Sequence, residues 1–197
     1  MLTQRSHDAL VYAARLHAKQ LRKGTRVPYV AHLLGTASIA LEHGADEDEA
    51  IAALLHDAVE DQGGQKTLSA IRKRFGDVVA EIVMGCSDTD RTPKPPWRAR
   101  KEAHLRHLRR APRSVRLVAA ADKLHNARSI VTDLREQGRA AWQRFNAGPE
   151  EQLWYYGALV DTFSRKGPRS IAGELRIVVD EMRKLTRGRL GFVRPEG

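Results

Sequence analysis

One stretch of the chain places imidazole and carboxylate side chains at spacings that suit metal chemistry. In AALLHDAVEDQGG, an apolar run carries His56 and Asp57 side by side, and Glu60 and Asp61 follow one helical turn later. Residues four apart share a face of a helix, so we expect His56 to lie over Glu60 and Asp57 over Asp61. Unpaired buried charge is costly, so these groups need a partner. A divalent cation with an activated water is one such partner; a helix end that frays into solvent is the alternative.

Two further residues complete a set of four candidate ligands. His32 opens a predicted helix in VPYVAHLLG, and Asp122 lies within another, in AAADKLHNAR. Taken singly, a histidine at a helix start is more often a cap, and an aspartate beside Lys123 is more often an ion-pair partner. With His56 and Asp57 they form an ordered set of two imidazoles and two carboxylates. Nitrogen and oxygen ligands without thiolates suit Mn²⁺ or Fe²⁺, with Zn²⁺ less favoured.

The elements that must position these residues are all expected to be helices. Apolar residues recur at steps of three and four, and no segment alternates as a strand does, which predicts an all-α fold. Asp46 and Glu49 form a capping-box pattern at the start of the helix that carries His56, and Thr67 is expected to cap the next one. The predicted helices span residues 6–22, 31–43, 46–62, 67–75, 77–86, 97–110, 113–137, 149–166 and 168–186. The polar, proline-rich segment 87–96 is predicted to be a loop.

Bulk properties narrow the function classes. A chain of 197 residues with a single cysteine, Cys86, excludes an internal disulfide framework and a cysteine-based zinc site, and it fits a reducing cytoplasm. No apolar stretch approaches the ~20 residues that a membrane span needs. The net charge of +10 attracts anions, whether nucleotides, nucleic acid or acidic membranes. We expect one domain over residues 1–187 and a loosely held basic tail over 188–197.

Three motifs in order carry a resemblance to a known family. RKGTRVPYVAH, LLHDAVED and ADKLHNAR resemble the HD superfamily of metal-dependent phosphohydrolases. Within it they are closest to the hydrolase domain of RelA/SpoT proteins and to stand-alone small alarmone hydrolases, over about residues 5–165. The resemblance implies a single HD-domain helical bundle of about eight to ten helices. It also implies that His32, His56, Asp57 and Asp122 hold one Mn²⁺, with Fe²⁺ or Zn²⁺ as alternatives.

The same resemblance suggests which residues perform the chemistry. Glu60 and Asp61 match an acidic pair that orients and deprotonates the attacking water. The structural alternative for Asp61 is a helix-end cap or a partner that orients His56. Arg22 and Lys23 match a basic pair that meets a purine and phosphate, although cations at a helix C-terminus are also favoured by the helix dipole.

Further substrate contacts are expected from four other side chains. Asn126 lies one turn past Asp122 and matches a nucleoside-contacting asparagine. Trp154 is a candidate for the base pocket, and Arg98 and Lys101 for the distal pyrophosphate; helix–helix packing and solvated cations are the alternatives. His125 is not expected to be a ligand, because successive helical residues point about 100° apart and Asn126 occupies the site face.

The resemblance implies a (p)ppGpp 3′-pyrophosphohydrolase that releases pyrophosphate and leaves GDP or GTP. One rival is an HD phosphohydrolase for another nucleotide, such as (p)ppApp, NADPH or a nucleoside monophosphate. A second rival is a nucleic-acid-binding module that uses the basic helix 97–110, which would show steep salt dependence. The expected partner is a small nucleotide rather than a membrane or nucleic acid, in a cytoplasmic protein that could form a homo-oligomer.

Overall fold

The computed structural model describes residues 1–87 and 95–188, and in these ranges the regular elements are helices, as predicted. A single isolated β-bridge in the described chain joins Leu21 and Pro28. The helices in order are α1 (Gln4–Leu16), α2 (Val30–Glu42), α3 (Glu47–Leu55), α4 (Ala58–Asp61), α5 (Gly64–Phe75), α6 (Asp77–Cys86), α7 (Trp97–Leu108), α8 (Arg113–Gln137), the 3-10 helix η1 (Gly138–Arg144), α9 (Pro149–Lys166) and α10 (Arg169–Arg187).

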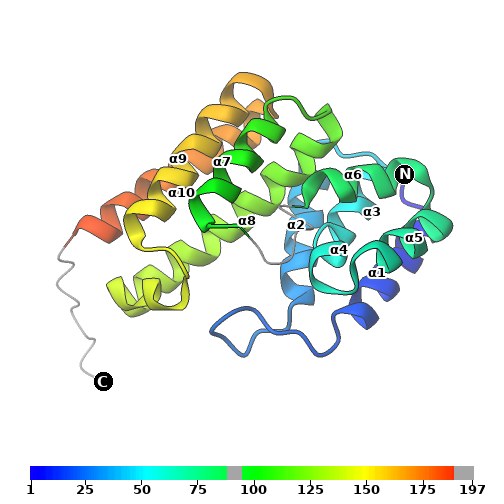
Figure 1. Ribbon diagram of the computed structural model, residues 1–197, viewed down its shortest axis with the longest axis horizontal. Helices are drawn as coiled ribbons and strands as arrows, with labels where there is room; N and C mark the ends of the chain where they lie inside the picture. Colours follow the sequence, from blue (N-terminus) through cyan, green and yellow to red (C-terminus); the bar gives the residue numbers. More distant parts are fainter. Residues whose placement is uncertain (88–94, 189–197) are drawn as a thin grey trace.

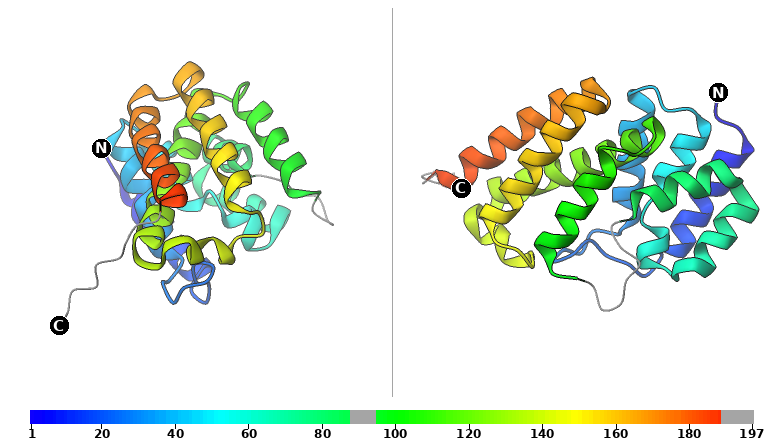
Figure 2. Two further views of the ribbon diagram at one scale, coloured as in Figure 1. Left: turned by 90° about the vertical axis from the view of Figure 1, so that its left-hand side faces the viewer. Right: turned by 45° about the horizontal axis from the view of Figure 1, so that its top comes forward.

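Helix α8 organises the molecule because it contacts both halves of the chain. It packs against α2, α3 and α6 from the N-terminal half and against η1, α9 and α10 from the C-terminal half. In Figure 1 it runs through the middle of the bundle, with α1 to α6 on one side and α7, α9 and α10 on the other. Two further views show α9 and α10 lying side by side along the outer edge (Figure 2).

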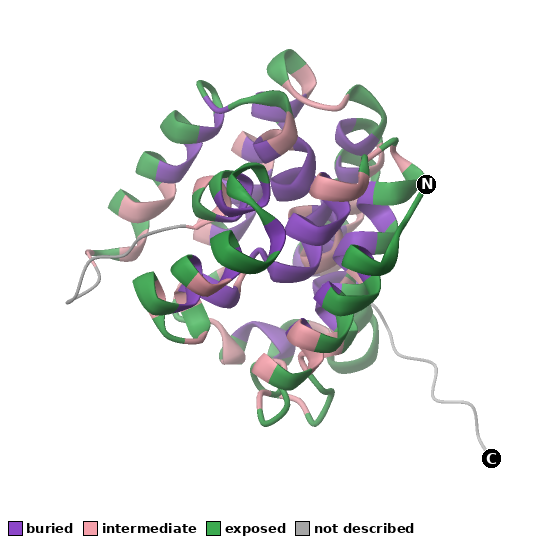
Figure 3. Ribbon diagram, turned by 90° about the vertical axis from the view of Figure 1, so that its right-hand side faces the viewer, coloured by how far each residue is buried: buried purple, intermediate pink, exposed green. Residues whose placement is uncertain are grey.

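The centre of α8 can lie within the core because it is made of small and branched apolar residues. The run from Leu117 to Ala121 is buried throughout, and α3 is buried along almost its whole length. Figure 3 shows buried residues gathered toward the middle of the bundle and exposed residues on the outer faces of the helices. A helix that is apolar on all sides is expected to be enclosed by others. Any polar group on α3 or α8 therefore lies in or beside the core.

The first helix is shorter than predicted. It ends at Leu16 rather than near Arg22. Beyond it, two backbone hydrogen bonds pair the chain with the segment before α2: Arg22 N–H donates to the Val27 carbonyl, and Tyr29 N–H donates to the Gln20 carbonyl, both at 2.9 Å. These tertiary bonds take the residues after α1 out of the helical conformation, which local periodicity does not reveal.

The prediction that one continuous helix carries His56, Asp57, Glu60 and Asp61 is wrong. Helix α3 ends at Leu55, and Asp57, with φ −96° and ψ −3°, precedes the short helix α4. Asp57 and Asp61 are still one helical turn apart, because Asp61 N–H donates to the Asp57 carbonyl at 3.0 Å. The bend places the histidine at the end of α3 and the acidic pair on α4.

Other helix boundaries show which local signals are reliable. The capping box of Asp46 and Glu49 starts α3 as predicted, with both reciprocal hydrogen bonds present. Pro149 begins α9 and Gly138 ends α8, also as predicted. The prediction that Thr67 caps a helix is wrong: α5 begins at Gly64, and Thr67 is buried and donates its hydroxyl to the carbonyl of Gln62.

Parts of two predicted segments lie outside the described residues. These are positions 88–94 of the predicted loop and positions 189–197 of the predicted tail. No helix in the described ranges is long and apolar enough to cross a membrane.

Candidate metal centre and nucleotide cavity

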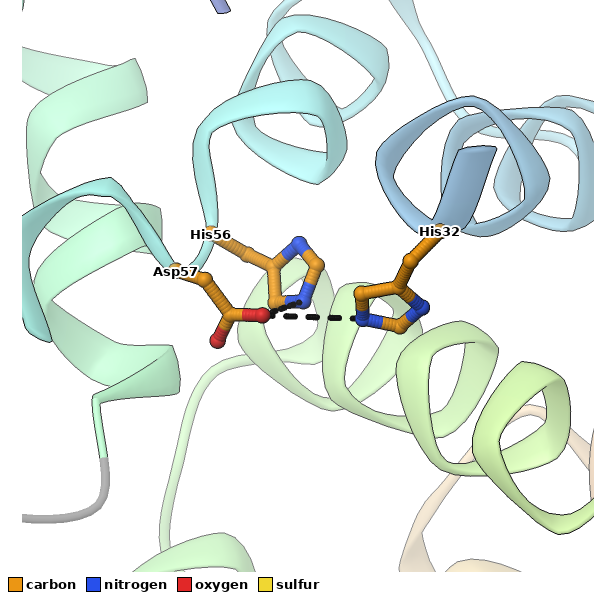
Figure 4. A group of neighbouring side chains, drawn as sticks. All are labelled: His32, His56 and Asp57. Carbon is orange, nitrogen blue, oxygen red and sulfur yellow. Dashed lines mark ion pairs between the residues drawn. The ribbon is translucent and has the colours of Figure 1, made fainter. Parts of the chain in front are cut away.

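Four side chains from three separate regions meet beside α8. His32 comes from the first turn of α2, His56 and Asp57 from the bend after α3, and Asp122 from the middle of α8. The Nε2 atom of His56 lies 3.0 Å from Asp57 Oδ2, and that of His32 lies 3.5 Å from the same oxygen. Figure 4 shows both rings directed toward this carboxylate. Asp122 Oδ1 lies 3.2 Å from His32 Nε2 and 3.6 Å from His56 Nε2.

This arrangement fits a divalent cation on two grounds. The Nε2 atoms of His32 and His56 make no hydrogen bond of acceptable geometry, although these residues are only 1% and 2% exposed and carboxylate oxygens of Asp57 and Asp122 lie nearby. Buried polar atoms in proteins are nearly always partnered, so two orphaned nitrogens aimed at one point indicate a missing ligand. In addition, ligand atoms about 2.1 Å from one cation and at right angles to each other are about 3 Å apart. The observed separations are close to that value.

The two imidazoles are held by bonds at their other nitrogens. His56 Nδ1 lies 2.8 Å from the Ala53 carbonyl, which only accepts, so the hydrogen is on Nδ1 and the Nε2 lone pair is free. His32 Nδ1 lies 2.9 Å from Nδ1 of His125. Helix α2 can approach this closely because it carries Gly35, where a Cβ atom would lie 2.2 Å from the His125 ring. Such outer contacts orient metal-binding histidines.

The two carboxylates are also held. The Tyr29 hydroxyl donates to Asp57 Oδ2 at 2.6 Å. Asp122 accepts from Lys123 Nζ at 2.6 Å and from Asn126 Nδ2 at 2.5 Å. The sequence alternative for Asp122, an ion pair with Lys123, is therefore present together with its approach to the histidines.

The electrostatics of the cluster favour the charged forms of its members. Burial opposes charge on His56, but the carboxylates of Asp57 and Asp122 outweigh it and raise the pKa of His56 well above its usual value. Burial likewise opposes ionisation of Asp57, but His56 and His32 hold the pKa of that carboxyl well below its usual range. Protons and a metal cation would compete for the same imidazole lone pairs, so binding of a cation would release protons.

The predicted acidic pair lies on α4, next to the cluster. Gln20 Nε2 donates to Asp61 Oδ2 at 2.7 Å. Burial raises the pKa of Asp61, and the neighbouring Asp57 and Glu60 carboxylates raise it further, against the opposing hydrogen bond from Gln20. Because Asp57 acts on Asp61 through its charge, the pair and the cluster share one electrostatic environment.

A cavity of about 250 Å³ opens from the same face of α8. The cationic side chains that line it come from four separate segments of the chain, and aromatic and amide side chains lie between them. The lining residues are Arg22, Trp97, Lys101, Lys123, Asn126, Ile130, Arg144, Phe145, Gln152, Tyr155 and Tyr156. Asn126 connects the cavity to the cluster, because its amide donates to Asp122 while its carbonyl oxygen accepts from Arg22 at 2.7 Å.

Three of the predicted substrate contacts lie elsewhere among the described residues. Lys23 is not in the cavity lining and donates to Asn146 at 2.7 Å. Arg98 and Trp154 form a separate surface pair, with the guanidinium carbon 3.2 Å from the indole ring centre. Arg98 also forms ion pairs with Glu102 and Glu151. The cavity thus contains Arg22, Lys101 and Asn126 of the predicted set.

Sequence reasoning missed several residues around the site. His125 was set aside by comparing it with Asn126, but it lies three residues after Asp122 and so shares its face. Tyr29 was assigned only to the extended connection, although its position three residues before His32 was a usable signal. Arg144 comes from η1, which no pattern predicted, and it forms an ion pair with Asp133.

The chain is similar in sequence to several known proteins. A 3′-pyrophosphohydrolase of guanosine 3′,5′-bis(diphosphate), MESH1, from Xenopus tropicalis is 37% identical over 126 residues, which cover 62% of this chain and 68% of that protein. The corresponding protein of Danio rerio is 35% identical, over 62% of this chain and 67% of its own length. The match to the Escherichia coli bifunctional (p)ppGpp synthase/hydrolase SpoT is 33% identical and covers 64% of this chain but only 18% of that protein.

The fold comparison and the family assignment agree. A solved structure described as a metazoan ortholog of SpoT that hydrolyzes ppGpp superposes with a TM-score of 0.75 at 25% identity, over 94% of this chain and 98% of the other. A Listeria monocytogenes protein, lmo0812, superposes with a TM-score of 0.66 at 29% identity, over 80% of this chain and 99% of the other. A sequence model of the HD domain matches residues 9–148, and the chain therefore belongs to the HD domain family.

Proposed function

We propose that this protein is a metal-dependent hydrolase that removes pyrophosphate from the 3′ position of guanosine 3′,5′-bis(diphosphate). The observation that supports it most strongly is the meeting of two orphaned imidazole nitrogens and two carboxylates beside a cationic cavity. The relatives named above have this activity in their names, which favours this substrate over other nucleotides.

In this proposal, His32, His56, Asp57 and Asp122 hold one cation, with Mn²⁺ as the first choice and Fe²⁺ or Zn²⁺ as alternatives. A cation in this position supplies Lewis acidity toward a phosphoryl oxygen of the 3′-pyrophosphate. Tyr29 and Asn126 fix the carboxylates, and His125 fixes His32.

In this mechanism, the acidic pair of Glu60 and Asp61 orients the attacking water and accepts its proton. The water oxygen forms a bond to the 3′ phosphorus, the bond from that phosphorus to the 3′ oxygen of ribose breaks, and the ribose oxygen takes up a proton. The products are GDP and pyrophosphate. The raised pKa of Asp61 suits a general base, because a base is most effective when its pKa approaches the working pH.

The cavity would hold the remainder of the nucleotide. Arg22, Lys101, Lys123 and Arg144 bring four positive charges to a ligand that carries four phosphates. Tyr155, Tyr156 and Gln152 offer aromatic surface and an amide to the base and ribose. The cytoplasmic location and a homo-oligomeric state remain predictions.

The test uses the purified full chain and guanosine 3′,5′-bis(diphosphate) with added Mn²⁺, with products resolved by chromatography. We expect equimolar GDP and pyrophosphate, loss of the reaction with a chelator, and recovery when Mn²⁺ is restored. Fe²⁺ and Zn²⁺ are tested in parallel for the native metal. Full activity in the chelator, or no pyrophosphate from this substrate, overturns the proposal.

A substrate panel separates this activity from its rivals. The adenosine analogue, NADPH and a nucleoside monophosphate are assayed under the same conditions. A higher kcat/KM for any of these would assign the site to that nucleotide and leave the metal chemistry in place.

A further inference from the structure

A chain of hydrogen bonds leads from the buried end of α1 to the acidic pair. His17, just beyond α1, is only 2% exposed, and its Nδ1 lies 2.7 Å from Gln20 Oε1. Gln20 Nε2 in turn donates to Asp61 Oδ2 at 2.7 Å. Gln62, the residue after Asp61, donates its amide to the same Gln20 oxygen at 2.5 Å. None of these contacts is needed to hold the metal cluster.

The directions of these bonds are fixed by chemistry. A carboxylate oxygen only accepts, so the Gln20 atom that faces Asp61 must be the amide nitrogen. The other end of the amide is then an oxygen, which suits the Gln62 amide group and requires the His17 hydrogen to be on Nδ1. If the Gln20 amide were flipped, an acceptor would face the Asp61 carboxylate and the Gln62 amide donor would face the Gln20 amide nitrogen.

The backbone of Gln20 and the ring of His17 are also held by contacts with neighbouring residues. Gln20 N–H donates to the His17 carbonyl and its carbonyl accepts from Tyr29 N–H, both at 2.9 Å. The His17 ring is stacked on the Tyr29 ring, with centres 5.2 Å apart and planes 16° apart. Tyr29 is the residue that binds Asp57. The same short segment therefore orients one carboxylate of the metal cluster and one of the acidic pair.

We infer that His17 and Gln20 are positioning residues for Asp61, with His17 locking the Gln20 amide so that its N–H group faces the carboxylate. This inference rests on the proposed function, because it gives Asp61 a role in proton transfer. A neutral amide donor can orient a carboxylate without the strong attraction of a cation, so the carboxylate remains able to accept a proton. The assignment accounts for the bonded Nδ1 of a buried histidine outside the metal cluster, whereas its Nε2 makes no hydrogen bond.

The test is a set of substitutions at His17 that separate its two nitrogens. In His17→Asn, the side-chain amide nitrogen can take the place of Nδ1 and donate to Gln20. In His17→Gln, the amide reaches the place of Nε2 instead and the bond to Gln20 is lost. We expect His17→Gln to lower kcat about 10-fold or more, in the range found when an orienting partner is removed. His17→Asn should recover at least half of the wild-type kcat.

Three further measurements distinguish positioning from a structural role. The KM for the nucleotide and the metal content per chain should stay at the wild-type values in both variants, because neither the cavity nor the cluster is altered. Gln20→Glu, which replaces the donor by an acceptor, should lower kcat at least as far as His17→Gln. His7→Gln is the matched control, since His7 is an exposed histidine on α1, and its kcat should be unchanged.

The outcomes separate this inference from the proposed function. If the wild-type protein does not hydrolyse the nucleotide, the proposed function fails. If the wild type is active and His17→Gln matches it in kcat, the positioning role is wrong while the proposed function stands. A parallel fall in kcat for His17→Asn and His17→Gln, with a lowered melting temperature in both, would make His17 a structural residue and would also overturn the inference.

Discussion

Buried ionisable side chains lie at both ends of helix α3, and they differ in whether their polar atoms are hydrogen-bonded. At its start, Glu49 is 2% exposed and its carboxylate is fully occupied: one oxygen accepts from Asp46 N–H and the other from Arg113, both at 3.0 Å. Beyond its last residue, His56 is equally buried, but its Nε2 has no hydrogen-bond partner. A satisfied polar group stabilises the native state, whereas an unsatisfied one costs free energy. We interpret the first end of the helix as serving folding and the second as serving the proposed cation.

The largest expected effect comes from His56→Asn. The asparagine amide can replace Nδ1 and keep the bond to the Ala53 carbonyl, but no atom replaces Nε2. We expect kcat/KM for the nucleotide to fall by about three orders of magnitude, as when a preorganised electrostatic partner is removed. The metal-free variant should still unfold in one cooperative transition, although it loses the attraction between the His56 imidazole and the carboxylates of Asp57 and Asp122. Steady-state kinetics, metal analysis and urea unfolding measure these quantities.

A variant that still binds one metal and turns over normally would show that Nε2 is not a ligand. A metal-free variant that no longer unfolds cooperatively would show that His56 is needed for folding, so that the two ends of α3 do not differ as described.

The next effect concerns Tyr29→Phe, which removes the hydroxyl that donates to Asp57. Loss of an orienting partner usually costs 10- to 100-fold in metal affinity or activity, so we expect metal affinity to weaken by about 10-fold. With saturating metal, kcat should return close to the wild-type value. Titration of activity against Mn²⁺ measures the change. Tyr12→Phe on α1 is the control, since the ring of Tyr12 packs against Phe75 and the cluster is not involved.

A smaller effect, of the opposite kind, is expected for Glu49→Ala. The capping box and the bond to Arg113 are lost, and we expect the free energy of unfolding to fall by about 2 kcal/mol. Activity at 25 °C should remain within twofold of the wild type, because the site lies at the other end of α3. Arg113→Ala should cost less, since the Arg113 side chain is 68% exposed. If Glu49→Ala abolishes activity without unfolding the protein, the division between the ends of α3 is wrong.

The smallest effect is a pH dependence at the first end of α3. Glu47 accepts hydrogen bonds from the Ser6 hydroxyl and from Thr3 N–H, and these lower its pKa from 4.5 to about 2. A lowered carboxyl pKa contributes stability that is present above pH 4.5 and is lost as the pH falls toward 2. Ser6→Ala should bring the pKa of Glu47 closer to 4.5, so that less stability is lost between pH 4.5 and pH 2 than in the wild type. Urea unfolding between pH 2 and 6 measures this shift, and identical curves for the two proteins would contradict it.

The fold class could be predicted because helical periodicity is a local signal. The capping box at Asp46, Pro149 at the start of α9 and Gly138 at the end of α8 each fix a boundary with one or two residues. The end of α1 could not be predicted in this way, because it depends on bonds between Gln20 and Tyr29, which belong to different local segments. Periodicity also missed the bend after Leu55, since the apolar run continues across it.

The residues of the candidate site could likewise be predicted only where the signal was local. The four proposed ligands share residue types that suit a metal and stand in recognisable motifs, so they could be named before their positions were known. The residues that hold them could not, because His125 and Tyr29 act through contacts between helices. Arg98 and Trp154 show the opposite case: their chemistry suits a nucleotide, but they interact with each other and are not among the residues that line the cavity.

The bond between Arg22 and Asn126 joins residues that are 104 positions apart. During synthesis on the ribosome, the N-terminal segment emerges long before α8, and domains generally acquire their structure as units. A nascent chain that lacks Asp122 and Asn126 has neither the fourth proposed ligand nor one wall of the nucleotide cavity. In the proposed mechanism, hydrolysis therefore cannot begin until α8 has been translated.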